Sequence, residues 1–248
     1  MKSSISFPSE ISVEPWHGGM LHKIEISGCT AWIVEPPFFS ENKYWFWLPE
    51  WPTAFPDRNG VKELLQMGFF MVHINVFGKF ANDEALQIMY SLYEYLQENG
   101  FEKKGAFIGM SMGGLYSFRF LEKYPHIANC IYADAPVCRL DWRNATRPVE
   151  AEEVSRAYGF GNDISILSRF SPVNNYKKMV EHDIPLLMIV GLNDSVVNAD
   201  ENGLMMAELW KKAGGRVEVI SRMSWGHHPH GLDCPGKIVR FITENTFR

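Results

Sequence analysis

The sequence predicts an α/β fold in which a mostly parallel sheet of about eight strands carries helices on both faces. Short apolar runs typical of buried strands alternate along the chain with segments of helical periodicity, and such alternation is typical of parallel sheets. The chain has 248 residues without an internal repeat or a low-complexity tract, so we expect a single compact domain.

The first elements have the pattern of antiparallel strands. Two runs between Leu21 and Glu35, LHKIEI and TAWIVE, are separated by the turn residues SGC, which predicts a hairpin. A third apolar run covers Tyr44–Leu48 and is followed by the proline-rich stretch PEWPTAFP. Because proline cannot continue a strand ladder, we expect a loop at the end of this strand.

Five further apolar runs predict buried strands, and they begin at Phe69, Gly105, Ala128, Pro185 and Val217. Helical spacing of apolar residues predicts helices over Asp83–Gln97 and Met112–Leu121. Residues 140–181 interrupt the alternation with an acidic and turn-rich segment. We therefore expect a cap-like insertion above the sheet at this point.

Composition excludes several classes of function. The formal net charge is -5 and the lysines and arginines are scattered, so we expect no nucleic-acid partner. No apolar run approaches the length of a membrane span, and the four cysteines form no CxxC pair. We expect a soluble, cytoplasmic monomer or homodimer with reduced thiols and no membrane association.

The strongest motif lies between the strand GAFIGM and the next helix, where residues 109–113 read GMSMG. GxSxG alone is common by chance, but between a strand and a helix it indicates a nucleophile elbow. Gly109 and Gly113 are expected there because a Cβ at either position would clash where the two backbones approach. Ser111 is the candidate nucleophile, and the Met112 N–H is the candidate first oxyanion donor.

A serine hydroxyl needs a base, and the base needs an orienting acid. Asp194 follows the strand PLLMIV, and His227 follows the last predicted strand in SWGHHPHG. We predict these as acid and base, in the chain order Ser, Asp, His. Asp194 has the alternative role of an Asx-turn or helix cap. Asp134, at the end of the strand ANCIYAD, is the rival acid, or else shapes the substrate pocket.

Three histidines lie within four residues, at His227, His228 and His230. They could be read as metal ligands, but no second cluster of cysteine or aspartate stands at a recognisable spacing. We therefore predict no metal. His228 and His230 are expected to contact the substrate or to support the loop.

The segments GMSMGG, VGLNDSVV and WGHHPHGL together resemble the α/β-hydrolase superfamily, from about Leu21 to the C-terminus. Within it the chain is similar to small bacterial hydrolases, some of them carbohydrate esterases, that combine a GHHPH ending with a YADAPVC-like segment, here Tyr132–Cys138. The resemblance implies the α/β-hydrolase fold and hydrolysis of an acyl or methyl ester on a sugar or polysaccharide fragment.

The chain departs from these relatives in the loop expected to complete the oxyanion hole. Many relatives carry a His-Gly pair after the third strand, whereas this chain has Leu48, Pro49, Glu50 and Trp51 there. Proline has no N–H to donate. The expected second oxyanion donor is therefore Leu48 or Glu50.

The chain contains eight tryptophans, several in or beside loops expected around the elbow. An indole suits the apolar face of a pyranose, so we expect Trp47, Trp51 and Trp225 among the substrate-binding residues. The alternative for Trp47, which alternates with Trp45, is a place in the core of a strand.

Together these residues predict a cofactor-independent serine esterase that forms an acyl-enzyme with a small-molecule or oligosaccharide ester. A peptidase or a thioesterase is the alternative among enzymes, because the same triad serves any acyl group. A binding protein that kept the fold without turnover is the alternative from another class. The presence of all three triad residues argues against it.

Overall fold

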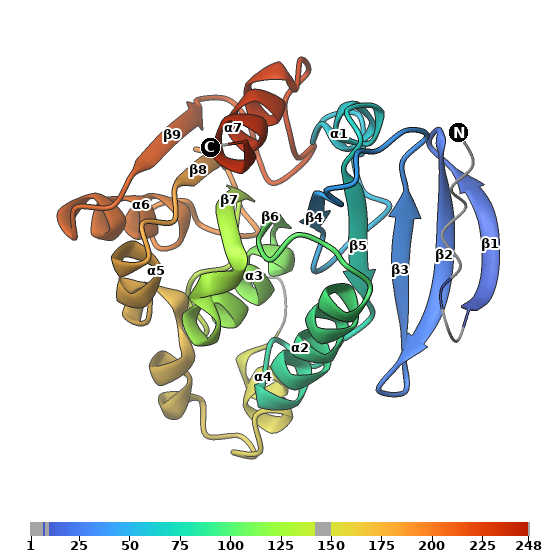
Figure 1. The fold of residues 1–248 in the computed structure, drawn as a ribbon. Helices are drawn as coiled ribbons and strands as arrows, with labels where there is room; N and C mark the ends of the chain where they lie inside the picture. Colours follow the sequence, from blue (N-terminus) through green and yellow to red (C-terminus); the bar gives the residue numbers. More distant parts are fainter. Residues whose placement is uncertain (1–6, 8–9, 142–149, 248) are drawn as a thin grey trace.

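The structure is a computed structural model that describes residue 7 and residues 10–141 and 150–247 (Figure 1). It contains a sheet with the strand order β1-β2-β3-β5-β4-β6-β7-β8-β9. The strands β4 to β9 are parallel to one another. The strands β1, β2 and β3 pair antiparallel, and β3 also pairs antiparallel with β5. The prediction of a mostly parallel α/β sheet is therefore confirmed.

The strands are β1 (Glu10–Trp16), β2 (Gly19–Ile26), β3 (Cys29–Glu35), β4 (Trp45–Trp47), β5 (Phe70–Ile74), β6 (Gly105–Met110), β7 (Ala128–Asp134), β8 (Leu186–Gly191) and β9 (Val217–Arg222). All the predicted strands are present. The described sheet has nine strands where about eight were expected. The predicted hairpin is β2 and β3, whose closing pair joins Ile26 and Cys29.

The helices are α1 (Val61–Gln66), α2 (Asp83–Glu98), α3 (Met112–Lys123), α4 (Ala151–Ala157), α5 (Lys177–Glu181), α6 (Gly203–Lys212) and α7 (Gly236–Thr246). Short 3₁₀ turns cover Pro125–Ile127, Ile164–Phe170 and Pro172–Asn174. The helix α2 shows why these segments are helical. The Asn82 side chain accepts a hydrogen bond from the Ala85 N–H at 2.9 Å, and Leu86, Met89 and Leu96 recur on its buried face.

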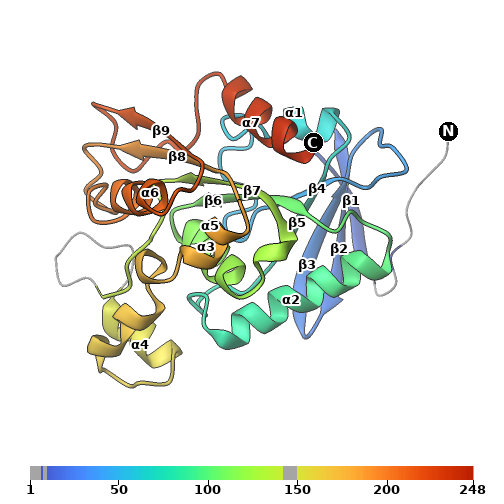
Figure 2. The ribbon, with the colours of Figure 1, turned by 60° about the vertical axis from the view of Figure 1, so that its left-hand side comes forward.

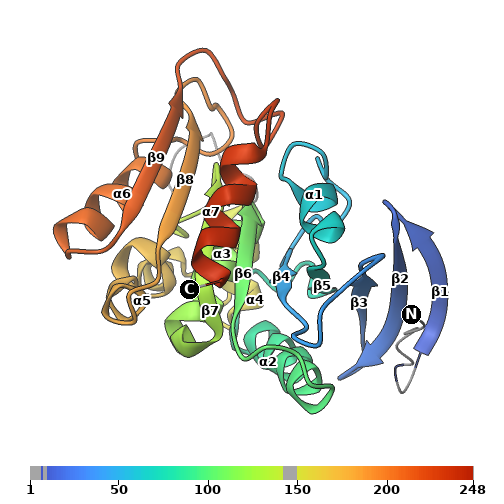
Figure 3. The ribbon, with the colours of Figure 1, turned by 45° about the horizontal axis from the view of Figure 1, so that its top comes forward.

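Helices cover both faces of the sheet, as Figure 2 shows. Apolar residues of α2, α3 and α6 pack on one face, while those of α1 and α7 pack on the other. The strands β5, β6 and β8 are buried along their whole length. Their continuous apolar runs follow from this two-sided burial. In Figure 3, the strand β9 and the helix α6 lie at one end of the sheet and β1 at the other.

The carboxyl ends of the parallel strands meet at one edge of the sheet. Ser111 follows β6, Asp134 ends β7, and the segments after β8 and β9 carry Asp194 and His227. In open α/β sheets such an edge is where ligands bind. The topology therefore gathers these residues, which lie far apart in the sequence.

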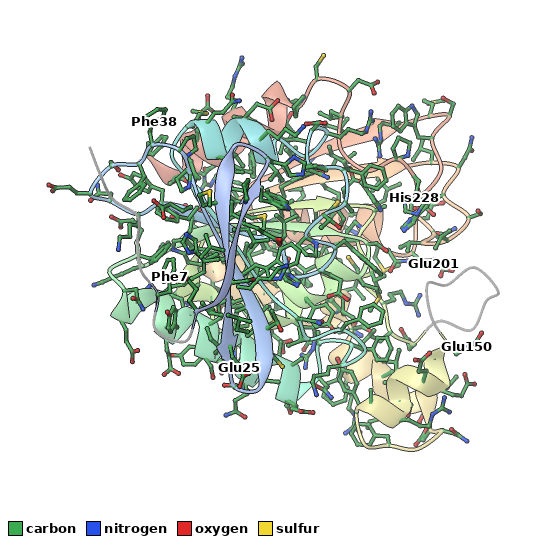
Figure 4. All side chains as sticks on the ribbon, turned by 90° about the vertical axis from the view of Figure 1, so that its right-hand side faces the viewer. Phe7, Glu25, Phe38, Glu150, Glu201 and His228 are labelled. Atoms are coloured by element: carbon green, nitrogen blue, oxygen red, sulfur yellow. The ribbon has the colours of Figure 1, made fainter. Side chains whose placement is uncertain are left out.

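The expected cap-like insertion at 140–181 is described in part, because residues 142–149 lie outside the described residues. The part that follows contains α4, two 3₁₀ turns and α5. Figure 4 labels Glu150, Glu201 and His228 on the same side of the molecule. A role of this segment as a cap stays a prediction.

No disulfide joins the cysteines of the described residues, of which Cys130 and Cys138 are buried. In the part of the chain that the structure describes, no helix has the length and apolar character needed to cross a membrane.

Candidate active site

Ser111 lies in the sharp turn between β6 and α3. Its backbone has φ 49° and ψ -117°, a strained conformation for a residue with a side chain. A Cβ on Gly109 would lie 2.7 Å from the Gly114 Cα, so the close approach of strand and helix requires glycine there. A Cβ on Gly113 would lie 3.4 Å from the Glu50 Cβ, which is an ordinary van der Waals contact and not the expected clash. The expected clash is instead at Gly114, where a Cβ would overlap Pro136.

A hydrogen-bonded relay joins the three predicted catalytic residues. The His227 Nε2 lies 3.0 Å from the Ser111 Oγ, and the His227 Nδ1 lies 2.7 Å from the Asp194 Oδ2. With the proton on Nδ1, His227 donates to Asp194 and accepts from the serine hydroxyl. All three residues are buried, with 6%, 7% and 8% of their surface exposed for Ser111, His227 and Asp194. This arrangement can remove the serine proton as the hydroxyl attacks a carbonyl.

Asp194 is held in the ionised form that this relay needs. Its Oδ1 accepts hydrogen bonds from the N–H groups of Val196 and Val197, both at 2.8 Å. Burial by itself raises the pKa of Asp194, but the hydrogen bonds from His227, Val197 and Val196 lower that pKa below its usual value. Asp194 therefore combines two of the expected roles, because one oxygen orients His227 and the other forms an Asx-turn.

The loops that carry Asp194 and His227 pack backbone against backbone. The Asn193 N–H donates to the Trp225 carbonyl oxygen at 3.0 Å. A Cβ on Gly191 would lie 2.5 Å from the carbonyl oxygens of both Trp225 and Gly226. This contact brings acid and base within hydrogen-bonding distance although the two residues lie 33 positions apart.

Asp134 lies fully buried beneath the histidine loop. Its backbone carbonyl accepts the Ser111 N–H at 3.0 Å. Its carboxylate accepts the Gly231 N–H at 2.8 Å and contacts the His230 Nδ1 at 2.9 Å. The Arg222 Nη2 lies 3.5 Å from it. Asp134 therefore connects the nucleophile turn to the loop that carries the base, and full burial excludes the expected contact with substrate.

His228 and His230 have different environments. His230 is 3% exposed and its Nδ1 faces Asp134, so it supports the loop. His228 is exposed and stacks on Phe55 with 5.9 Å between ring centroids. Burial, followed by the charges of the neighbouring His227 and His230, lowers the pKa of His228. It is the one of the pair that a substrate can reach.

The three histidines place one nitrogen each within 4.8 Å of one another, a spacing that invites a metal ion. However, both ring nitrogens of His227 take part in the relay with Asp194 and Ser111. A cation ligated by His227 would therefore remove the base from the reaction.

The backbone contacts of residues 48–51, the oxyanion loop, distinguish between Leu48 and Glu50 as the second oxyanion donor. The Leu48 N–H donates to the Val72 carbonyl at 3.0 Å, so it is used in the sheet and Leu48 is wrong as a donor. The Glu50 backbone nitrogen lies 3.6 Å from the position of a Cβ on Gly113. Met112 opens α3, where the helix leaves its first N–H without an acceptor. Met112 and Glu50 thus remain the oxyanion candidates.

The side chain of Glu50 is also unusual, since it is 4% exposed and burial raises its pKa to about 7. The nearby His73 holds the same loop through a 2.8 Å hydrogen bond from its Nδ1 to the Leu48 carbonyl. Burial lowers the pKa of His73 to about 4, against the opposing effect of that hydrogen bond. His73 is therefore neutral at pH 7.

The tryptophans expected around the elbow separate into different roles. Trp47 is fully buried and stacks on Phe107 at 5.7 Å, so its expected contact with substrate was wrong and the core alternative holds. Trp51 is 41% exposed at the edge of the oxyanion loop. Trp225 is partly buried and lies beneath the guanidinium of Arg222 at 4.2 Å.

Two arginines that sequence reasoning missed support the histidine loop. Arg58 donates from its Nε to the His230 carbonyl at 2.8 Å and lies 5.1 Å from the Trp225 ring. Arg222 donates to the Gly231 carbonyl at 2.6 Å. Neither arginine belongs to a motif, because its partners are loop atoms that only the fold brings near.

Comparisons with known proteins agree with this geometry. Residues 83–242, more than half of the chain, match the prolyl oligopeptidase family (Peptidase_S9). A sequence search of curated proteins gives no match.

Solved structures share the fold at low sequence identity. An acylaminoacyl peptidase of Pyrococcus horikoshii has a TM-score of 0.68 at 16% identity over 87% of this chain, which spans only 38% of the peptidase. An S-formylglutathione hydrolase of Agrobacterium tumefaciens has a TM-score of 0.62 at 16% identity, covering 97% of this chain and 98% of its own. Est1E of Butyrivibrio proteoclasticus has a TM-score of 0.65 at 14% identity, covering 92% of this chain and 99% of its own.

The family match spans the nucleophile elbow and the segments that carry Asp194 and His227. The chain is therefore a serine hydrolase of the α/β-hydrolase superfamily and belongs to the prolyl oligopeptidase family.

Proposed function

We propose that the chain hydrolyses carboxylic esters of small hydroxylated molecules, sugars among them, through an acyl-enzyme. The observation that carries this proposal is the relay from Ser111 through His227 to Asp194, with 3.0 Å and 2.7 Å between the bonded atoms. No other group in the described site offers a nucleophile already bonded to its base.

In the first half of the reaction, the Ser111 Oγ attacks the ester carbonyl while His227 takes its proton at Nε2. Asp194 stabilises the imidazolium through Nδ1. The resulting oxyanion is held by the N–H groups of Met112 and Glu50. His227 then gives its proton to the leaving alcohol, and the acyl group remains on Ser111.

In the second half, water takes the place of the alcohol. His227 removes a proton from it as it attacks the acyl carbonyl, and the acid leaves as Ser111 regains its proton. One oxyanion donor contributes about 3 kcal/mol to the stabilisation of such a transition state. The reaction needs no cofactor.

Exposed aromatic rings beside the oxyanion loop support a hydroxylated substrate. Trp51 is exposed beside the oxyanion loop and contacts the exposed Phe77 edge to face, with 5.8 Å between centroids. Aromatic surfaces of this kind pack against the apolar face of a sugar ring.

A peptidase is the second candidate, and the family match favours it. Residues 83–242 resemble a peptidase family, and the same relay can open an amide if the leaving amine is protonated. The two candidates differ in the leaving group and not in the nucleophile.

The first experiment tests the nucleophile by intact mass after incubation with a fluorophosphonate. We expect one adduct on the wild type and none on Ser111→Ala or His227→Ala, with the melting temperature of Ser111→Ala within a few degrees of wild type. An adduct that persists on Ser111→Ala would reject Ser111, and a wild type that never labels would favour the binding-protein alternative.

The second experiment separates ester from amide. Rates are compared on 4-nitrophenyl acetate, an acetylated methyl xyloside, an aminoacyl 4-nitroanilide and an acyl thioester. We expect the acetylated sugar to have the highest kcat/KM. A higher kcat/KM on the anilide would assign the chain to the peptidases.

A further inference from the structure

A cleft of about 530 Å³ opens beside the oxyanion loop, between that loop and the faces of β2, β3 and β5. Small-molecule sites typically occupy about 300–1,000 Å³. The residues that matter here are Lys23, Trp32, Glu50, Trp51, Asn75 and Phe77, all of which line it. None of them belongs to the catalytic relay.

Glu50 connects this cleft to the nucleophile. Glu50 lines the cleft, and its Cβ and backbone nitrogen face Gly113, two residues after Ser111. A molecule in the cleft would therefore contact the same loop residue whose backbone faces the nucleophile turn.

The carboxyl group of Glu50 faces no donor of the protein. Within the described residues, no hydrogen bond or ion pair is found for it, although the residue is only 4% exposed. Its oxygens do not belong to the fully enclosed side-chain atoms that lack a partner, so they keep contact with solvent. A ligand whose hydroxyl groups donate to them would replace that solvent with direct hydrogen bonds.

The remaining lining indicates the chemistry of the ligand. Lys23 provides a cation, which also pairs with Glu14 at 2.6 Å, and Asn75 provides an amide. Trp51 and Phe77 provide exposed rings. Lys23 would repel a cationic ligand and Glu50 an anionic one, while hydroxyl groups both donate and accept. The cleft therefore suits a neutral, hydroxyl-rich ring.

We propose that this cleft is a subsite for a neutral sugar ring of the ester substrate, with Trp51 and Phe77 against the ring and Glu50 accepting from its hydroxyl groups. The proposal rests on the proposed ester hydrolysis for its biological meaning. Binding of the sugar itself can be measured without turnover, so the two can fail separately.

The binding experiment uses Ser111→Ala, which cannot turn over, and methyl β-D-xylopyranoside or methyl β-D-glucopyranoside as probe. Binding is followed by saturation-transfer NMR and by tryptophan fluorescence. We expect saturable binding of at least one glycoside. Adding Phe77→Ala should weaken it about tenfold, and adding Glu50→Gln should weaken it as well.

Phe38→Ala is the matched control, because Phe38 is 76% exposed and lies outside this cleft. It should leave the dissociation constant unchanged. Phe77 is 67% exposed, so its removal should not disturb folding. No saturable binding of either glycoside, or binding insensitive to both Phe77→Ala and Glu50→Gln, would overturn the proposal. Binding of ethylammonium but of neither glycoside would also overturn it.

A kinetic experiment tests whether the subsite serves the reaction. The ratio of kcat/KM for an acetylated methyl xyloside to that for 4-nitrophenyl acetate should fall about tenfold in Phe77→Ala and stay constant in Phe38→Ala. An unchanged ratio in Phe77→Ala would separate the cleft from catalysis and reject its role as a substrate subsite. If the wild type fails to label with fluorophosphonate while the glycoside still binds, the hydrolase proposal fails and the sugar site stands.

Discussion

The described residues include two buried His–Asp pairs with nearly the same geometry and different surroundings. The His227 Nδ1 lies 2.7 Å from Asp194, and the His230 Nδ1 lies 2.9 Å from Asp134. In the first pair the other ring nitrogen reaches the Ser111 hydroxyl. In the second, the carboxylate instead holds the Gly231 N–H and approaches Arg222.

The difference teaches that a His–Asp pair is not a sign of catalysis by itself. The role depends on what the second ring nitrogen and the second carboxylate oxygen contact. Asp194 lies in the loop after β8 and reaches Ser111 only through His227, whereas Asp134 is bonded to His230 and to the Gly231 N–H. In the proposed mechanism His227 transfers a proton while Asp194 orients it, whereas Asp134 connects the nucleophile turn to the loop that carries the base.

The largest effect is expected on kcat, which should depend on Asp194 as the acid that orients the base. Asp194→Asn should lower kcat on 4-nitrophenyl acetate about 10⁴-fold, because the amide favours the wrong tautomer of His227. Steady-state kinetics measures this, with the melting temperature as control for folding. If kcat of Asp194→Asn falls by less than about tenfold, Asp194 does not orient the base and the assigned difference between the two His–Asp pairs is wrong.

Asp134 should matter first for stability. Asp134→Ala should lower the free energy of unfolding by about 3–5 kcal/mol, because it leaves Arg222 and His230 buried without their partner. Urea denaturation measures this. The control is Asp233→Ala, whose side chain is 75% exposed in its ion pair with Arg58, and which should cost less than about 1 kcal/mol. Equal losses in both variants would contradict the supporting role of Asp134.

The third prediction concerns Glu50, a buried carboxyl group that is not paired with a histidine. The pH dependence of the free energy of unfolding tests its raised pKa. Burial raises the pKa of Glu50 from 4.5 to about 7, so the folded state retains a proton that the unfolded chain releases. Stability from this group is complete below pH 4.5 and is lost as pH rises towards 7. Glu50→Gln should therefore gain stability relative to wild type across this window, by up to roughly 3 kcal/mol. A difference that does not vary with pH would contradict the raised pKa.

The smallest effect is expected at the exposed member of the histidine cluster. His228→Ala should change the free energy of unfolding by less than about 0.5 kcal/mol, whereas His230→Ala should cost about 1–3 kcal/mol through the unpaired Asp134. Thermal and urea denaturation measure both. A larger loss in His228→Ala than in His230→Ala would reverse the assignment of their roles.

Much of the fold was predictable from local pattern. The hairpin, the buried strands and the elbow depend on apolar period and on glycine at the turn, which a short window of sequence displays. The strand β1 was missed because its apolar alternation covers only Ile11 and Val13 before Pro15, and because the strand is exposed along almost its whole length. Trp47 was placed in the substrate site because an aromatic residue in a strand looks the same whether it faces the core or a loop.

The candidate site was predictable only in part, for a related reason. Leu48 and Glu50 were equivalent from sequence, and the Leu48 N–H was excluded only by its bond to Val72 in a neighbouring strand. The supporting residues Arg58 and Arg222 bond to backbone atoms of a loop that lies 172 and nine positions away from them in the sequence. Such partners follow no motif.

The sequence by itself determined the identity and order of Ser111, Asp194 and His227, because each stands at the tip of a predicted strand, and parallel strands place their carboxyl ends at one edge. Only the tertiary structure decided which carboxylate serves which histidine. Asp134 ends β7 and Asp194 follows β8 by three residues, and the choice between them depends on how the loops after β8 and β9 pack against each other. That packing is set by backbone contacts between distant segments, where one glycine, Gly191, lets the two loops touch.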